Sequence, residues 1–413
     1  MEKIKNRWLI AASAVGVHIS IGSVYAYSVW ILPLNVLLGW SKLDIVIAFS
    51  IAIFFLGFSA ALLGPMVSRI GPRKSGTLAA LFYGVGALGC GLAVSLASLP
   101  LFILSYGVLG GIGLGIGYIT PVTTLIKWFP DKRGLATGIA IMGFGFASMV
   151  FGPIIAKLCE MMDPSNAFYI LGIVYFFLIF CSAQYLAPPP NNWILEKEKA
   201  LLAKGGISAQ KREIASMTIH EARRTTRFYY MWIMMFINIC CGIALISVAS
   251  PMAQEVIGLT ALQSASLVGI MGLFNGLGRI AWSSLSDYIG RPNTFIAFFV
   301  IQIAAFMLLT MTESSLVFQT LLLIIMTCYG GAFATLPAFL SDMFGAKQLG
   351  AIHGAELTAW AMAGLVGPAI VSYILEFTGN YNATLYIFTG FFVVAFIVSL
   401  MMARNIAMLH KNV

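Results

Sequence analysis

Two short loops, GPMVSRIGPRK at residues 64–74 and SLSDYIGRP at residues 284–292, each follow a long apolar run and contain an isoleucine–glycine pair beside an arginine. The glycines of the two pairs, Gly71 and Gly290, are separated by about half of the 413-residue chain. Such internal symmetry predicts that the second half of the protein repeats the architecture of the first.

The composition is that of a membrane protein. Hydrophobic residues make up 60% of the sequence and charged residues 9%, and the mean hydropathy is +0.93. A water-soluble protein of this size needs far more charge to cover its surface, so we expect an integral membrane protein. The six cysteines lie in or beside apolar runs without metal-ligand spacing, and we expect no metal and no cofactor.

Apolar runs recur along the whole chain, and each is long enough to cross a bilayer as an α-helix. The first run is too long for a signal peptide and is taken as a spanning helix. Charged and Pro/Gly-rich breaks give twelve predicted spans, at 8–34, 44–68, 75–95, 99–126, 134–158, 165–187, 226–254, 261–286, 293–312, 315–341, 348–376 and 381–404. We therefore predict an all-α membrane protein of two six-helix bundles.

Basic residues are distributed unevenly between the two sides of the predicted membrane. Of 24 lysines and arginines, only Lys42 and Lys157 fall in loops opposite the N-terminus, and Arg279 lies within a span. By the positive-inside rule, both termini are predicted to be cytoplasmic, and we expect the plasma (inner) membrane as the location. The net charge of +9 follows from this topology, so we expect no nucleic-acid partner.

A long polar segment at 188–225 separates an N-terminal bundle, 1–187, from a C-terminal bundle, 226–413. The segment mixes lysine, arginine and glutamate with some apolar residues, which predicts a cytosolic linker with an amphipathic surface helix.

The duplication extends to a second pair of loops. WFPDKRGLATG at 128–138 follows the fourth span and DMFGAKQLGAIHG at 342–354 follows the tenth, with Phe129 matching Phe344. A six-plus-six duplication is typical of a transporter whose halves rock about a central binding site.

The loop at 64–74 resembles the signature loop of the major facilitator superfamily, with Ser68 in place of the usual aspartate, whereas the copy at 284–292 keeps the aspartate. The resemblance implies the twelve-helix fold of that superfamily. It also implies a gating role for the residues of the two loops, namely Arg69, Gly71, Arg73, Asp287, Gly290 and Arg291.

WFPDKRGLATG and LFNGLGR at 273–279 resemble more narrowly the oxalate/formate antiporter family, which is related to the proton-linked monocarboxylate transporters. The resemblance covers the whole chain in helix number and loop placement.

Arg279 is the most conspicuous charge in the predicted spans. It precedes Asp287, at the end of its span, by eight residues, which places it about 12 Å deep. Asn275 lies one turn earlier on the same face. Gly272 and Gly276 have no side chains and leave space on that side of the helix. A guanidinium matches a carboxylate bidentately, so Arg279 is predicted to bind an organic anion. The alternative is a permanent salt bridge with another helix.

Three groups could carry a proton. Glu356, inside the eleventh span, could carry it, could be the static partner of Arg279, or could lie near the cytosolic mouth. His18, with Tyr25 on the same face, could carry a proton or could be a hydrogen-bonded core histidine. Asp44, at the start of the second span, is a further candidate.

Aromatic residues complete the predicted site. The resemblance places the following residues around the substrate, together with Asn275 and Arg279: Tyr25, Tyr118, Tyr329 and Phe333. In the oxalate carriers, the eleventh helix supplies a second cation, a lysine, where this sequence has Trp360. One fixed cation balances one carboxylate, so we expect a monocarboxylate such as lactate, pyruvate or formate in a cavity that Trp360 helps to line.

The animal relatives have an aspartate where this chain has Asn275, and a lysine in the first helix that is missing here, so their proton pathway does not transfer. We expect a monomeric symporter of a monocarboxylate and a proton in the lipid bilayer. An exchanger of the oxalate/formate type is the alternative. A sensor would need a larger output domain than the linker offers, and no nucleophile–base pairing indicates an enzyme.

Overall fold

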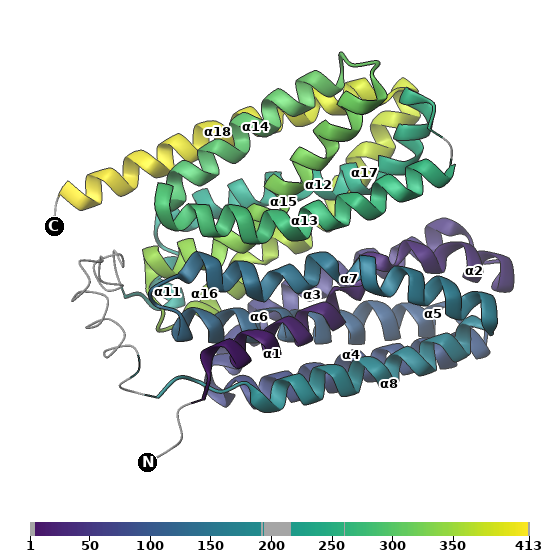
Figure 1. Cartoon of the computed structure of the whole chain (residues 1–413), viewed down its shortest axis with the longest axis horizontal. Coiled ribbons are helices and arrows are strands. Elements are labelled where there is room, and N and C mark those ends of the chain that lie inside the picture. The colour runs from purple at the N-terminus through teal and green to yellow at the C-terminus, as the bar shows by residue number, and fades with distance from the viewer. Residues whose placement is uncertain (1–4, 191–192, 194–215, 260, 412–413) are drawn as a thin grey trace.

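The computed structural model describes residues 5–190, 193, 216–259 and 261–411, and within these ranges the chain forms helices and no strand (Figure 1). The N-terminal half comprises α1 (Arg7–Ile21), η1 (Gly22–Ala26), α2 (Ser28–Leu38), α3 (Lys42–Ile70), α4 (Pro72–Ser95), α5 (Leu99–Phe102), η2 (Ile103–Gly110), α6 (Gly111–Trp128), α7 (Arg133–Met161) and α8 (Pro164–Tyr185). The C-terminal half comprises α11 (Ile219–Ala222), α12 (Thr226–Ile257), α13 (Ala261–Ile289), α14 (Arg291–Leu309), α15 (Ser315–Phe344), α16 (Leu349–Glu356), α17 (Thr358–Thr378) and α18 (Tyr381–Lys411).

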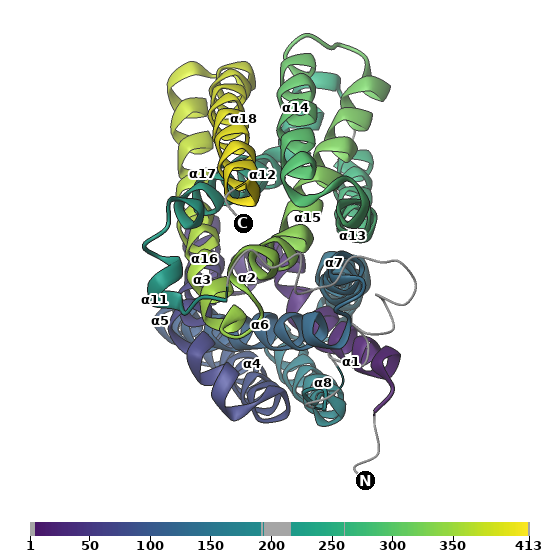
Figure 2. The same ribbon diagram turned by 90° about the vertical axis from the view of Figure 1, so that its left-hand side faces the viewer.

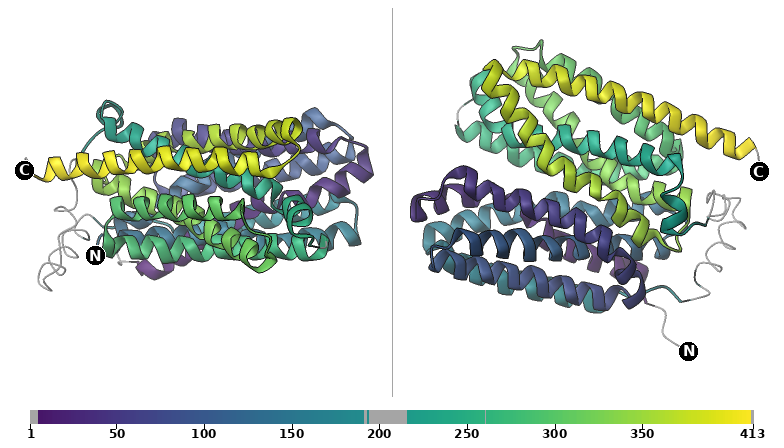
Figure 3. Two further views of the ribbon diagram at one scale, coloured as in Figure 1. Left: turned by 90° about the horizontal axis from the view of Figure 1, so that it is seen from above. Right: turned by 180° about the vertical axis from the view of Figure 1, so that it is seen from behind.

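The two halves form two layers, one of purple to blue helices and one of green to yellow helices (Figure 1). Helix α1 begins, and helix α18 ends, at the same end of the molecule, which we call the terminal end (Figures 1 and 3). The described chain therefore begins and ends at one end of the molecule.

Eleven helices within the described residues are long and apolar enough to cross a membrane, six in the N-terminal half and five in the C-terminal half. The remaining predicted span, 261–286, corresponds to α13, which has 29 residues but is not one of these eleven. The prediction of an all-helical membrane protein is confirmed for the described chain, and the number twelve stays a prediction.

Two predicted spans of the N-terminal half are less regular than expected. The span predicted at 8–34 is interrupted by the 3₁₀ segment η1, where the Ser23 hydroxyl donates to the carbonyl oxygen of Ser20 at 2.7 Å. The span predicted at 99–126 contains the π-helical segment η2. Side-chain hydrogen bonds to the backbone compete with the regular helical pattern. The helix predicted at 8–34 is interrupted at η1 for this reason, whereas the span predicted at 99–126 lies within one long apolar helix, Leu99–Trp128, that includes η2.

The eleventh predicted span, 348–376, is also broken, between α16 and α17. At the break, the Thr358 hydroxyl donates to the carbonyl oxygen of Ala355 at 2.7 Å and accepts from the indole nitrogen of Trp232 at 2.8 Å. The predicted span is found, since Leu349–Val371 forms one candidate membrane span, but its helical pattern breaks at Leu357 because a threonine that is anchored by a neighbouring helix bonds to the backbone of its own turn. The break directly follows Glu356.

The halves meet along two lines of close helix packing, α3 against α16 and α17, and α7 against α13 (Figure 2). Small residues permit the approach: a β-carbon on Gly64 would lie 2.5 Å from the carbonyl oxygen of Gly350. A β-carbon on Gly145 would lie 2.7 Å from the Cα atom of Gly276. Such contacts require backbones to touch, which is typical of helix pairs in membranes.

The two paired loops adopt the same local geometry. Gly71 and Gly290 have φ values of +82° and +86°, in the left-handed region that favours glycine. Each glycine precedes a helix with proline in its first turn, α4 and α14. The sequence similarity between the loops therefore corresponds to a repeated turn.

Candidate functional site

Arg279 lies on α13 between the two halves and is completely buried. Its Nε atom donates to Asn275 Oδ1 at 3.0 Å, and its Nη1 atom donates to the carbonyl oxygen of Ile141 on α7 at 3.2 Å. The guanidinium carbon lies 5.6 Å from the ring centre of Phe144 and 5.5 Å from that of Phe333. Cation–π attraction to the two rings helps to hold the charge away from water.

Aromatic rings from both halves enclose this charge. Tyr118 on α6 is 5.3 Å from Trp360 on α17, and Phe333 on α15 is 4.6 Å from Trp360, between ring centres. The hydroxyls of Tyr25 and Tyr329 are 3.5 Å apart across the interface. The structure thus brings together all seven residues that were predicted to bind substrate: Tyr25, Tyr118, Asn275, Arg279, Tyr329, Phe333 and Trp360.

Several polar atoms in this group are unused. In the described part of the chain, Arg279 Nη2, the Tyr118 hydroxyl and the Trp360 indole nitrogen have no hydrogen-bond partner. A buried donor without a partner is costly, and the cost is removed when a ligand supplies an acceptor. Two of these groups carry only donors, and Tyr118 can donate as well, so the arrangement suits a small anion.

The proton candidates differ in position. Within the described residues, neither oxygen of buried Glu356 has a hydrogen-bond partner, so the alternative of a static Glu356–Arg279 pair does not hold in this structure. His18 accepts or donates at 3.2 Å with the carbonyl oxygen of Tyr118, and its ring lies 5.4 Å from that of Tyr118. Asp44 lies at the start of α3, where its carboxylate accepts from the Ser41 hydroxyl. It precedes Gly57, which lies against the carbonyl oxygen of Leu357, by thirteen residues, or about 20 Å along the helix. The structure does not bring Asp44 to this group.

Two residues of the group were missed from sequence. Phe144 contacts Tyr25, Tyr118 and Trp360, but it is one of 30 phenylalanines and no signal marks it. His353 lies on α16, one turn before Glu356, with its ring 5.9 Å from that of Tyr118. A histidine three residues before a glutamate in an apolar run was a readable signal that we did not use.

The second-half signature loop forms a network that crosses between the halves. The Asp287 carboxylate accepts from the backbone nitrogens of Gly134 at 3.0 Å and Leu135 at 3.1 Å, at the start of α7. Arg291 bridges Asp287 at 2.5 Å and Asp342 at 3.1 Å, and it also donates to Ser286. A carboxylate at a helix N-terminus satisfies free backbone donors and is favoured by the helix dipole.

The first-half loop makes weaker contacts. Ser68 donates to the carbonyl oxygen of Gly64 in its own helix, and a β-carbon on Gly350 would lie 2.6 Å from its hydroxyl. Arg73 donates to Gln184 at 2.7 Å within the N-terminal half, and Arg69 lies in the last turn of α3. The gating role of both loops stays a prediction.

Replacing Asp287 with alanine is expected to lower the free energy of unfolding by roughly 3 kcal/mol, because it removes a helix cap and leaves Arg291 with one carboxylate fewer. A melting curve in detergent measures this. Asp163→Ala is the matched control, since Asp163 caps α8 within one half and accepts from Ser165 at 2.8 Å. Equal melting temperatures of the two variants would contradict a role for Asp287 in holding the halves together.

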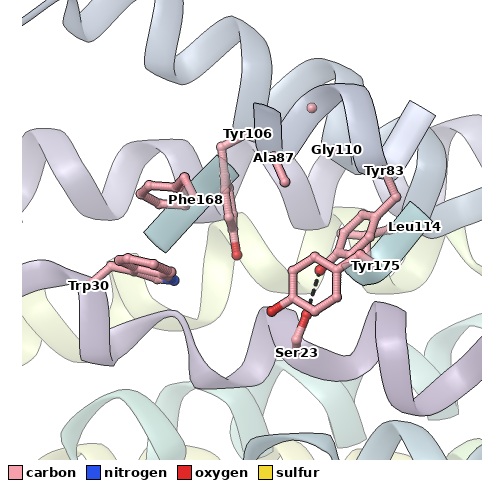
Figure 4. Close-up of a pocket in the computed structure, with 10 residues that line it drawn as sticks. Ser23, Trp30, Tyr83, Ala87, Tyr106, Gly110, Leu114, Phe168 and Tyr175 are labelled. Atoms are coloured by element: carbon pink, nitrogen blue, oxygen red, sulfur yellow. Dashed lines mark hydrogen bonds between the residues drawn. The ribbon is translucent and has the colours of Figure 1, made fainter. Parts of the chain in front are cut away.

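A cavity inside the N-terminal half is not this site (Figure 4). Ser23, Tyr83, Tyr106 and Tyr175 are among its lining residues, and the Ser23 hydroxyl is 2.8 Å from that of Tyr83. None of the seven predicted substrate residues lines it. Among the described residues, no three His, Cys, Asp or Glu side chains gather to hold a metal ion.

Two helical halves with repeated loops and a buried cation between them are typical of a secondary transporter. A sequence model of the Major Facilitator Superfamily matches residues 13–363, and the chain belongs to this family.

The chain is 30% identical over 376 residues to the oxalate:formate antiporter of Oxalobacter formigenes, covering 89% of this chain and 85% of that protein. It is 24% identical over 362 residues to monocarboxylate transporter 12 of Homo sapiens, covering 81% and 68%. The solved structure of the proton:xylose symporter XylE, bound to 6-bromo-6-deoxy-D-glucose, superposes with a TM-score of 0.73 over 96% of this chain and 95% of that chain. At 15% identity, this last likeness concerns the fold alone. The sequence resemblance to this superfamily and to these carriers is confirmed.

Proposed function

We propose that the protein is a secondary active transporter of small monocarboxylates, of the lactate, pyruvate or formate type, working by alternating access. The observation that carries the proposal is the state of Arg279, a fully buried guanidinium with an unused Nη2 donor and no ion pair to a carboxylate among the described residues. A charge that is kept buried without a counterion is suited to a ligand that brings the opposite charge.

The walls of the site favour a monoanion. Arg279 is held by neutral groups, and the positions around it are aromatic, with Trp360 where the oxalate carriers have a lysine. A carboxylate that accepts from Arg279 and Tyr118 leaves no net charge, whereas a dianion leaves one negative charge in an apolar enclosure. The loaded carrier can then reorient at low cost.

We further propose that a proton accompanies the anion and that Glu356 or His18 carries it, with Asp44 the least favoured by position. The terminal end faces the cytoplasm of the plasma (inner) membrane in this proposal, because basic residues concentrate in the loops predicted for that side. The transporter acts as a monomer, since each chain contains both halves of its site.

An exchanger of organic anions is the second candidate, supported by the similarity to a protein named as an oxalate:formate antiporter. Counterflow into preloaded vesicles occurs with both mechanisms. Accumulation driven by a pH gradient, with no anion inside, occurs only with proton symport.

A thermal-shift screen tests the substrate class. Lactate, pyruvate and formate are expected to raise the melting temperature of the purified protein more than oxalate does, because a ligand at 100 times its Kd adds about 2.7 kcal/mol of stability. Arg279→Ala is expected to abolish these shifts, and Arg404→Ala, an exposed arginine on α18, serves as the control that keeps them. A larger shift with oxalate than with any monoanion would refute the monocarboxylate assignment.

A further inference from the structure

Next to the group around Arg279 lies a second set of buried polar side chains that the anion does not use. His18, His353 and Glu356 are each no more than 1% exposed. In the described part of the chain, His18 Nδ1, both ring nitrogens of His353 and both oxygens of Glu356 have no hydrogen-bond partner. Five such atoms in one region are unusual, since nearly all buried polar groups in folded proteins are paired.

Tyr118 connects this set to the anion site. Its ring centre lies 5.4 Å from that of His18, 5.9 Å from that of His353 and 5.3 Å from that of Trp360. Glu356 follows His353 by three residues and precedes Trp360 by four, so it occupies the turn between two side chains that both contact Tyr118. Glu356 therefore stands at the end of α16 between two residues of the aromatic group, and its side chain is buried.

Few other charges are close to this carboxyl. The elements packed against α16 are α3, α6, α11, α12, α15 and α17. Among the ionisable side chains of these elements, the phenol of Tyr118 lies beside His353, Lys127 lies in the last turn of α6, and Tyr373 on α17 is exposed. The others are engaged or lie at helix ends: Asp44 with Ser41, Arg69 in the last turn of α3, Arg227 over the ring of Phe344, Glu221 with Thr218, His220 exposed beside it on α11, and Asp342 with Arg291.

The missing partner must fit this chemistry. A second organic anion would meet a carboxyl group and no fixed cation, and it would need more room than closely packed side chains leave. A proton, carried with a water molecule, neutralises the carboxylate and gives the imidazole and the carboxyl group a hydrogen-bond partner.

We propose that Glu356 and His353 form the proton-binding site of this transporter, separate from the anion site at Arg279, with Glu356 taking the proton and His353 positioning it. This inference rests on the proposed function. In the loaded carrier, the substrate anion balances Arg279 and Glu356 is neutral. In the empty carrier, Glu356 has released its proton to water, and its negative charge offsets that of Arg279 in the net charge of the core without an ion pair between the two groups. Both reorienting forms then have no net charge in the apolar core, which couples one proton to one anion.

The test separates proton-driven uptake from exchange in proteoliposomes that contain a pH-sensitive dye, with lactate, pyruvate and formate as probes. Glu356→Gln is expected to lose accumulation driven by a pH gradient, and the accompanying dye signal, by about 100-fold, because the empty form keeps an unbalanced Arg279. Counterflow by this variant is expected to stay within about threefold of wild type, because only loaded forms move. His353→Gln is expected to reduce proton-driven uptake and to displace its pH profile while sparing counterflow.

Glu160→Gln and His220→Gln are matched controls, because both side chains are exposed. Proton-driven accumulation at the wild-type level in Glu356→Gln would overturn the proposal, and so would loss of counterflow together with accumulation. If Glu356→Gln does not fold, an unchanged pH profile in His353→Gln overturns it instead. Wild-type protein that exchanges monocarboxylates but shows no proton-driven uptake refutes this inference alone, whereas absence of any counterflow refutes the proposed function itself.

Discussion

Arg279→Ala is expected to abolish monocarboxylate uptake, with a loss of roughly 100-fold or more, while the protein still folds. The guanidinium is the only full positive charge among the seven residues of the site, and truncating one partner of a buried charge pair costs on the order of 2–5 kcal/mol. The variant is expected to fold because the empty protein buries this charge without a carboxylate partner among the described residues. The alanine substitution therefore removes the free-energy cost of burying an unpaired charge. Uptake of labelled acid into proteoliposomes, beside a melting curve, measures both effects.

Arg279→Lys tests whether charge alone suffices. Lysine keeps the charge but loses the planar fork that reaches Asn275, Ile141 and the substrate together, so uptake is expected to fall about tenfold. Arg404→Ala again serves as the control. Normal uptake by Arg279→Ala would remove the basis of the proposed function.

Gly354→Leu is expected to block the transport cycle almost completely. A β-carbon on Gly354 would collide with the carbonyl oxygen of Ala60, so α16 could no longer lie against α3 at the terminal end. The variant is expected to remain open at that end, and turnover, which requires both closures, is expected to fall roughly 50-fold. Uptake assays measure the loss.

The open state has its own readout. In a background without the exposed Cys181, Thr123→Cys would place a thiol at a buried position opposite Gly350, and it is expected to react with a membrane-impermeant maleimide only when Gly354→Leu is present. Gly390→Leu on α18 is the matched control, because a β-carbon there has no atom within 4 Å. Wild-type transport by Gly354→Leu would show that this helix contact does not need to form.

Much of the site could be predicted from the sequence because membrane burial makes charge conspicuous. Arg279 and Glu356 stand out in apolar runs, and the spacing from Arg279 to Asp287 placed the guanidinium at mid-depth. The convergence of Tyr118, Phe333 and Trp360 on it could not be calculated from helix periodicity, and it was expected only through the family resemblance.

The rest depended on contacts between segments that are distant in sequence. The break after Glu356 requires Trp232 to anchor Thr358, a contact across 126 residues. Phe144 could be assigned to the site only when the rings of four helices were placed together, whereas His353 is marked in the sequence by its position three residues before Glu356. A histidine in an apolar helix is read as a core residue until its neighbours are known to offer it no partner.

The unequal strength of the two interhalf contact lines has a consequence for how the molecule moves. Along α7 and α13, a carboxylate accepts hydrogen bonds from backbone amides of the other half, whereas along α3 and α16 the contacts described above are those of a serine hydroxyl, small side chains and glycines. The α3–α16 contact should therefore open first, while the α7–α13 contact stays closed and acts as the hinge. The two halves would then separate along one side of their interface rather than evenly on both sides.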